Sequence, residues 1–514
     1  MIVKYKFLEC VGCSMKELFA GHDEELDPFG SGSIATTNGE IEYDKVNAID
    51  PDDGMFGVGD GVYCPAFSVL MGTVFASPDA DEILSVGDRR LTWWEDDSVV
   101  PPWKVSLINP LTWSQSNPVP DDLSRDVLGM DPEEMFVFAD SGGFQVKSFP
   151  DMCVVDSPDL HSFEKKRIAP EKLLEWQAKN ATAGAILDFS PYIVDSNQGE
   201  TEGLGGVPIS EFYDQLFKPN LEQTIENATR MYEHKKRIGA DGFMLYNVLH
   251  GTVPFDQSKR ADYYIREWYD AVDDIGDFDG WGIGAGSTNI AKLALNLVFV
   301  SENIDESHLH FFGTGSLAYR AILEYWRLHD GENYAVTSDS TSFEVGSQYR
   351  QFFNPLIHGN DISVSQRSDD VDQIVADVTP CTCAVCSQME RVFGPEWIWS
   401  RDDAQVGTAI NMHNLNLLLQ RHRMVQALVQ GAGWELPDLY KNDADSQPYV
   451  FWKIFHNIFS DENVHDVLAC MKFIKRGIED GMDAALDDFV FQSAYSDKEG
   501  PLIRKKNVAS FMEW

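Results

Sequence analysis

The chain lacks several features that mark other classes of protein. Its 514 residues contain no run of about 18 uninterrupted apolar residues, so the sequence predicts no membrane-spanning helix and no membrane partner. The start MIVKYKFLEC does not show the basic-then-apolar pattern of a secretion signal, which favours a soluble, intracellular protein. Cysteine is scarce, with eight residues, and this excludes a disulfide-based scaffold.

Basic residues are also few. The 40 Lys and Arg residues face 83 Asp and Glu residues, which gives a formal net charge of -43. The acids are spread along the chain, and molar salt would screen their repulsion, so we expect a halophilic protein from a salt-rich cytoplasm. Near the C-terminus, six basic residues form either a nucleic-acid contact or a solvated helix face: Lys472, Lys475, Arg476, Arg504, Lys505 and Lys506.

What the chain has is enough apolar material for a large core, 43% hydrophobic residues with 12% aromatic. Short apolar runs alternate with amphipathic stretches, and there are eight such runs: 62–70, 104–110, 135–140, 184–190, 242–251, 280–286, 308–315 and 333–340. This pattern predicts an α/β fold, a closed (β/α)8 TIM barrel, with a doubly wound open sheet as the alternative. The segment GWGIGAG lacks the context of a dinucleotide-binding loop.

Acidic side chains follow three of these runs. Asp140, Asp188 and Asp339 each come at the end of an apolar run, and His250 and Gly284 end two others. Because the carboxyl ends of barrel strands form one face, we expect these residues to converge there. A single Asp at a strand end is more often a turn or a helix cap, but two nearby carboxylates could divide the nucleophile and acid/base roles at a sugar anomeric carbon.

A second cluster has the residue types of a metal site. The segment PCTCAVC supplies Cys381, Cys383 and Cys386. His413 follows further along the chain, at the expected start of a helix. Three thiolates and one imidazole predict one structural zinc ion per chain, since a closed tetrahedral site leaves no position for substrate. Chance clustering of free cysteines is the alternative.

These motifs together resemble the guanine transglycosylase superfamily, which comprises the tRNA-guanine transglycosylases and their DNA-modifying relatives. The resemblance covers about residues 60–425 and depends on DSGGFQV, on SDSTSF, and on the cysteine and histidine spacing. It implies a barrel enzyme with an inserted zinc subdomain that exchanges a guanine in a polynucleotide for a free 7-deazaguanine. It also implies a homodimer or heterodimer formed through the zinc subdomain.

The resemblance assigns roles to the strand-end residues. Asp339 matches the nucleophile, Asp140 the acid/base, and Asp188 the residue that reads the guanine edge. The base pocket would further include Ser141, Gly142, Gly143, Phe144, Gln145, His250, Gly284 and Ala285. The target nucleotide would have to be flipped out of its stack before reaction.

The pocket departs from the family pattern at several positions. The family usually has Gln-Gly where this chain has His250 and Gly251, and Gly-Gly-Leu where it has residues 284–286, while Ser190 replaces a frequent cysteine. These departures, and the missing tRNA-binding appendage, favour DNA as the substrate over tRNA. A non-catalytic zinc-bearing partner subunit is a third possibility, against which the two retained aspartates argue.

The sequence also predicts a division into four parts. These are an N-terminal extension, the catalytic barrel, the zinc-binding subdomain and a helical, basic C-terminal region, at 1–58, 59–376, 377–425 and 426–514.

Overall fold

A computed structural model describes the part of the chain on which the following account is based. The described residues are 35–36, 39–40, 61–67, 69–100, 102–110, 119–143, 169–191, 209–250, 262–284, 290–314, 320, 323–324, 326–327, 331, 333–341, 343, 351–353, 362–363, 383–395, 397–399 and 404–429. Most of the predicted N-terminal extension and nearly all of the C-terminal region therefore lie outside them. The four-part domain division stays a prediction.

The centre of the fold is one parallel sheet of eight strands. They are β3 (Gly61–Pro65), β6 (Val105–Ile108), β7 (Phe136–Ala139), β8 (Ala183–Ala185), β9 (Met244–Leu249), β10 (Gly280–Ile283), β11 (His308–Phe311) and β12 (Ala335–Ser340). From β6 to β12 each strand pairs with the next one along the chain, and β12 pairs with β3, which leaves β3 and β6 as the two edges. A parallel bridge between Ala66, just after β3, and Leu107 in β6 joins these two edge strands, so the sheet is nearly closed. The predicted eight-stranded parallel sheet is confirmed.

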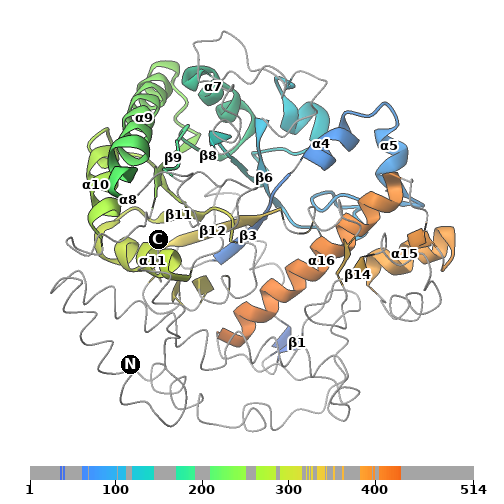
Figure 1. Cartoon of the computed structure of the whole chain (residues 1–514). Helices are drawn as coiled ribbons and strands as arrows, with labels where there is room; N and C mark the ends of the chain where they lie inside the picture. The colour runs from blue at the N-terminus through green and yellow to red at the C-terminus, as the bar shows by residue number, and fades with distance from the viewer. Residues whose placement is uncertain are drawn as a thin grey trace, which may run out of the picture.

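Helices flank this sheet, as alternating strands and helices require (Figure 1). They are α4 (Val69–Phe75), α5 (Ala80–Ile83), η2 (Leu123–Leu128), α7 (Pro170–Asn180), α8 (Ile209–Phe212), η4 (Tyr213–Phe217), α9 (Lys218–Ile238), α10 (Tyr263–Asp273) and α11 (Ile290–Asn303). Helix α9 shows how the sequence sets a boundary. Basic residues fill its last turn, and Gly239 ends it with φ 67°, a conformation that glycine adopts at little cost.

The predicted runs extend beyond the strands that they mark, and two of them show why. In 62–70 the strand ends at Pro65 and helix α4 has begun at Val69. In 184–190 the strand ends at Ala185, so Asp188 lies three residues beyond it. Both runs stay apolar past the strand because the chain remains buried where it leaves the sheet, and hydrophobicity alone does not mark that boundary.

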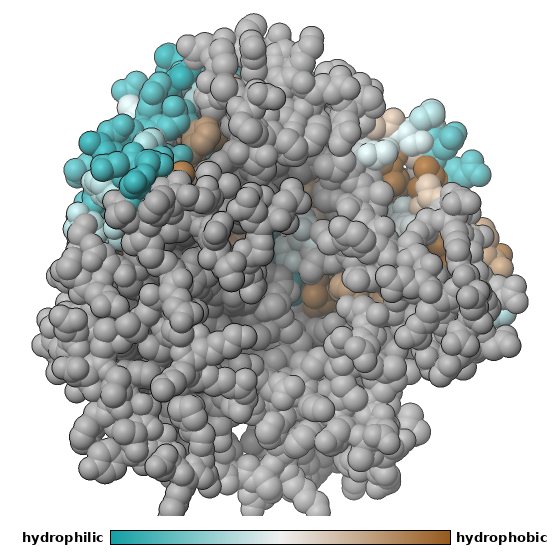
Figure 2. Space-filling model, viewed as in Figure 1, coloured by the Kyte–Doolittle hydropathy of each residue, from teal (hydrophilic) through white to brown (hydrophobic). Residues whose placement is uncertain are grey.

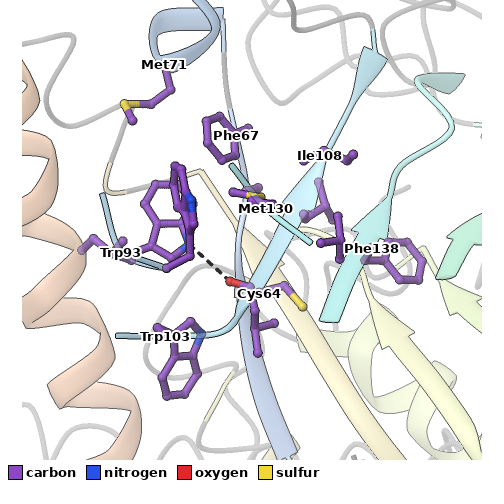
Figure 3. Close-up of a cluster of buried hydrophobic side chains, with 14 of the residues drawn as sticks. Cys64, Phe67, Met71, Trp93, Trp103, Ile108, Met130 and Phe138 are labelled. Carbon is purple, nitrogen blue, oxygen red and sulfur yellow. Dashed lines mark hydrogen bonds between the residues drawn. The ribbon is translucent and has the colours of Figure 1, made fainter. Parts of the chain in front are cut away.

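The core lies on both faces of the sheet, which explains why the strands are apolar throughout. All four residues of β6 and of β7 are buried. Beside β3 and β6, aromatic and sulfur-containing side chains form a compact cluster in which Phe67 lies near Trp93 (Figure 3). In contrast, hydrophilic residues cover the outer surface of α9 and α10 (Figure 2).

The remaining elements include a helical unit beside the first part of the barrel. It comprises α15 (Ala384–Phe393), η5 (Trp397–Trp399) and α16 (Ala404–Val429). Three short antiparallel strand pairs are also present: β1 (Ala35–Thr36) with β2 (Gly39–Glu40), β4 (Ser85–Val86) with β5 (Arg89–Arg90), and β13 (Gln351–Phe352) with β14 (Ile362–Ser363). Helix α15 contacts the β4–β5 hairpin, where Gln388 donates to the Val86 carbonyl at 2.8 Å. None of the described helices is both long and apolar enough to cross a membrane.

The expectation that His413 opens a helix is wrong. Helix α16 begins at Ala404, and His413 lies well inside it. The residues just before His413, including Ile410 and Met412, are already buried on the helix. Gly407 and the polar residues Gln405, Thr408 and Asn411 interrupt the apolar pattern from which the start was inferred.

Candidate functional site

Asp140 directly follows β7, and the backbone after it is built around its carboxyl group. Asn109, which directly follows β6, donates from Nδ2 to Asp140 Oδ2 at 2.6 Å. Gly142 has φ 76°, and its N–H is hydrogen-bonded to the Asp140 carboxyl group. A left-handed conformation at this position favours glycine, so the first glycine of the DSGG motif shapes the turn that holds Asp140.

The second glycine allows two strand ends to approach each other. A Cβ atom on Gly143 would lie 2.1 Å from the backbone oxygen of Asp188, which no side chain could tolerate. Gly143 N–H donates to Ser141 Oγ at 3.1 Å, and Ser141 Oγ donates to Asp188 Oδ1 at 3.1 Å. The motif after β7 therefore holds both its own aspartate and the aspartate after β8.

Asp188 is bound from its other side by His250. The His250 ring nitrogen Nε2 lies 2.7 Å from Asp188 Oδ2, so the imidazole donates from Nε2 to the carboxylate. His250 is buried, with its ring edge against Trp268 and its Nδ1 side against the backbone of Gly284. A Cβ atom on Gly284 would come within 2.3 Å of Nδ1, which is why this position has no side chain.

Asp339 lies within β12, next to its last residue, and completes the group. Gly313, just after β11, donates its N–H to Asp339 Oδ1 at 2.7 Å. His310 Nε2 lies 3.5 Å from the same oxygen. The side chains of Asp339 and Asp188 are each 14% exposed, so both can be reached by a ligand.

The three carboxyl groups influence one another. Burial, together with the negative charges of Asp188 and Asp339, raises the pKa of Asp140 from 3.8 to about 7. The hydrogen bonds from Asn109 and Gly142 oppose this shift. At neutral pH Asp140 therefore exists in both its acid and its base form, which is the property of a group that gives and takes protons.

Sequence reasoning missed two residues of this site, Asn109 and His310. Asn109 follows β6 in the same way that Asp140 follows β7. The expectation that residues at the carboxyl ends of the strands form the site could therefore have found it. His310 lies within HLHFFG, where a histidine in a buried strand gives no sign of which way it points.

A second site is formed by α15 and α16. Cys383, Cys386 and His413 are all buried, and one ligand atom from each lies within 4.8 Å of the others. His413 Nδ1 is 3.2 Å from Cys383 Sγ and 3.3 Å from Cys386 Sγ. Cys383 is the residue that caps the start of α15, which places the two sulfur atoms on the same side of the helix.

The surroundings of His413 fit a metal ligand. Its Nε2 lies 2.7 Å from the carbonyl oxygen of Phe353, which fixes the proton on Nε2 and leaves Nδ1 as the atom facing the two sulfurs. Such a hydrogen bond on the far nitrogen is the usual way in which a metal-binding histidine is oriented. These three residues could therefore bind a metal ion.

Other predicted residues lie outside the described residues. In the base pocket these are Phe144, Gln145 and Ala285, in the metal motif Cys381, and near the C-terminus all six basic residues Lys472, Lys475, Arg476, Arg504, Lys505 and Lys506. Of the predicted site, the structure brings together Asp140, Ser141, Gly142, Gly143, Asp188, His250 and Gly284, with Asp339 close enough to act on Asp140.

Comparison with protein-family models and with curated proteins finds no match for this chain.

Proposed function

We propose that the chain is a guanine transglycosylase, which exchanges a guanine base in a nucleic acid for a free 7-deazaguanine of the 7-cyano-7-deazaguanine class. The observation that supports this most is the group of three strand-end carboxyl groups, in which the pKa of Asp140 is raised to about 7. A double displacement needs one ionised carboxylate and one group that changes protonation at neutral pH. The resemblance of the DSGGFQV and SDSTSF segments to the superfamily gives the reaction its class.

In this reaction Asp339 is the nucleophile. One of its carboxylate oxygens forms a bond to C1′ of the target nucleotide while the bond from C1′ to the guanine nitrogen breaks. Asp140 in its acid form gives its proton to the departing base, so that the base leaves neutral. The second half reverses these steps: ionised Asp140 takes a proton from the incoming 7-deazaguanine, whose nitrogen then displaces Asp339 from C1′.

Asp188 recognises the base. Each of its oxygens accepts one hydrogen bond within the protein, from Ser141 and from His250, and each has a further lone pair. The free lone pairs suit the adjacent N–H groups on the edge of a guanine. Because His250 occupies the place of the usual family glutamine, the pocket would read the base with a different donor.

DNA is the favoured nucleic acid, for the reasons drawn from the sequence, and tRNA is the alternative. The metal at Cys383, Cys386 and His413 would be zinc, completed by Cys381, with a structural role. The metal-ligand residues belong to α15 and α16, whereas the carboxyl groups lie at the strand ends, and the proposed reaction steps use the carboxyl groups.

The proposal is tested by trapping the covalent intermediate on denaturing gels. Guanine-containing DNA and tRNA are offered separately to the full chain in molar salt. We expect the wild type to form an adduct with DNA, and Asp339→Ala to form none while its thermal unfolding stays within a few degrees of the wild type.

Asp241→Asn is the matched control, because this exposed aspartate lies before β9, at the opposite end of the strands, and it should trap as the wild type does. An adduct in Asp339→Ala would remove Asp339 as the nucleophile. An adduct with tRNA alone would transfer the proposal to the tRNA enzymes, and no adduct with either would refute the transglycosylase.

A further inference from the structure

His310 lies beneath Asp339 in the interior of the sheet. Its side chain is 0% exposed, and its ring stacks on Phe138 with centroids 4.1 Å apart and planes at 11°. Phe312 meets the ring edge-on, so the imidazole is held on two sides by aromatic groups. Its orientation is therefore fixed, and each ring nitrogen has one definite neighbour.

The hydrogen bonds around Thr337 determine where the His310 protons are. Thr337 Oγ1 lies 3.2 Å from the Leu309 carbonyl, to which only the hydroxyl can donate. The same oxygen lies 2.8 Å from His310 Nδ1, so it must accept there, and Nδ1 carries a proton. A neutral imidazole would then present a bare Nε2 to the Asp339 carboxylate oxygen 3.5 Å away, with two acceptors facing each other.

Charged groups near Asp339 act on it from more than one side. The buried Arg320, whose guanidinium lies over the Tyr63 ring, interacts with the Asp339 charge, although no described Lys or Arg forms an ion pair with Asp339. The other titratable groups that interact with Asp339 are Asp140 at the end of β7, and Tyr63 and Cys64 on β3, where burial raises the pKa of both so that they stay neutral. A proton on His310 Nε2 would give Asp339 an opposite charge and turn the repulsive contact into an attractive one.

We propose that His310 is the positioning residue of Asp339, with both ring nitrogens protonated, and that its Nε2–H holds the carboxylate in the attacking orientation. This role rests on the proposed function. In the free protein the Gly313 N–H donates to Oδ1, and the buried His310 Nε2 faces the same oxygen at 3.5 Å without a formed hydrogen bond, which leaves Oδ2 to form the bond to C1′. When that bond forms, Oδ1 becomes the ester carbonyl oxygen and keeps both donors, so His310 neither gains nor loses a proton.

The first test observes His310 without any substrate. Nitrogen NMR of protein labelled with ¹⁵N-histidine, with the His310 signals identified by their loss in His310→Gln, reports whether each ring nitrogen carries a proton. We expect both nitrogens to be protonated near neutral pH in the wild type, and Nε2 to lose its proton in Asp339→Asn, which removes the negative charge. An unprotonated Nε2 in the wild type would overturn the proposal.

The second test uses three variants that separate the donor from the packing. In His310→Gln the side-chain nitrogen takes the place of Nε2, in His310→Asn it takes the place of Nδ1, and His310→Phe keeps the stacking on Phe138 but has no donor. We expect adduct formation to slow about 100-fold in the Asn and Phe variants and at most about tenfold in the Gln variant, the loss expected from a misplaced nucleophile.

A wild-type rate in His310→Phe would show that His310 only fills space, and would overturn the proposal. If the wild type traps no nucleic acid although its Nε2 is protonated, the transglycosylase fails and the His310–Asp339 pair stands.

Discussion

The carboxyl site and the cysteine-histidine site solve opposite electrostatic problems. At the strand ends, Asp140, Asp188 and Asp339 lie close together, and burial and the like charges of the other two raise the pKa of Asp140. At α15 and α16, the residues Cys383 and His413 present soft, electron-donating atoms to one another in a fully buried space. A proton or a substrate reduces the repulsion between the carboxyl groups, whereas a bound cation would reduce the repulsion between the sulfur and nitrogen atoms. One arrangement therefore suits a reaction, and the other suits a permanent ligand.

The largest effect that sharpens this contrast is expected at Asp140. Asp140→Asn keeps the shape of the side chain but can neither give nor take a proton. We expect the protein to bind nucleic acid and to exchange bases 10² to 10⁴-fold more slowly, which is about the usual contribution of a general acid/base. Release of labelled guanine from the nucleic acid measures the rate. Asp241→Asn, the exposed control, should react as the wild type does.

The raised pKa of Asp140 also gives a dependence on pH. In the proposed reaction the acid form is needed for guanine to leave, so adduct formation should fall about tenfold per pH unit above about 7, and the dependence should vanish in Asp140→Asn. The folded protein holds this proton more tightly than the unfolded chain, whose pKa is near 3.8. Asp140 therefore lowers the free energy of unfolding progressively as pH rises from about 4 to about 7.

Thermal unfolding checks the same shift without substrate. The melting temperature of Asp140→Asn should rise relative to that of the wild type across this range of pH, because the variant cannot ionise. A constant difference would mean that the Asp140 carboxyl group has an ordinary pKa in the folded protein.

The sequence predicts the sheet better than it predicts the site. Each of the eight apolar runs overlaps a strand because residues buried on both faces must be apolar, and this pattern is local. The strand-end rule then brings Asp140 and Asp188 together. It does not show that Ser141 links them or that His310 lies beneath Asp339, because these contacts join residues 47 and 29 positions apart and depend on side-chain direction.

The metal site gives the next largest effect. Cys383→Ser replaces a thiolate with a weaker ligand, so we expect loss of the metal and a free energy of unfolding lower by several kcal/mol, with soluble yield falling more than the rate per folded molecule. Elemental analysis should find about one zinc per wild-type chain. Cys10→Ser, outside the motif, serves as the control. A metal-free protein that unfolds and reacts as the wild type does would end the structural-zinc proposal.

The smallest effect concerns the charge that surrounds both sites. With a net charge of -43, self-repulsion should destabilise the fold in dilute buffer, and molar salt should screen it. We expect the melting temperature to rise by at least about 4 °C from dilute to molar potassium chloride, which corresponds to roughly 1–2 kcal/mol. The pKa of Asp140 should change much less, because its causes are burial and close neighbours, which salt screens poorly. Repeating the pH titration at both salt concentrations therefore separates the two effects. Equal melting temperatures would contradict the halophilic interpretation, whereas a large salt-dependent change in the Asp140 titration would mean that its neighbours are exposed to solvent.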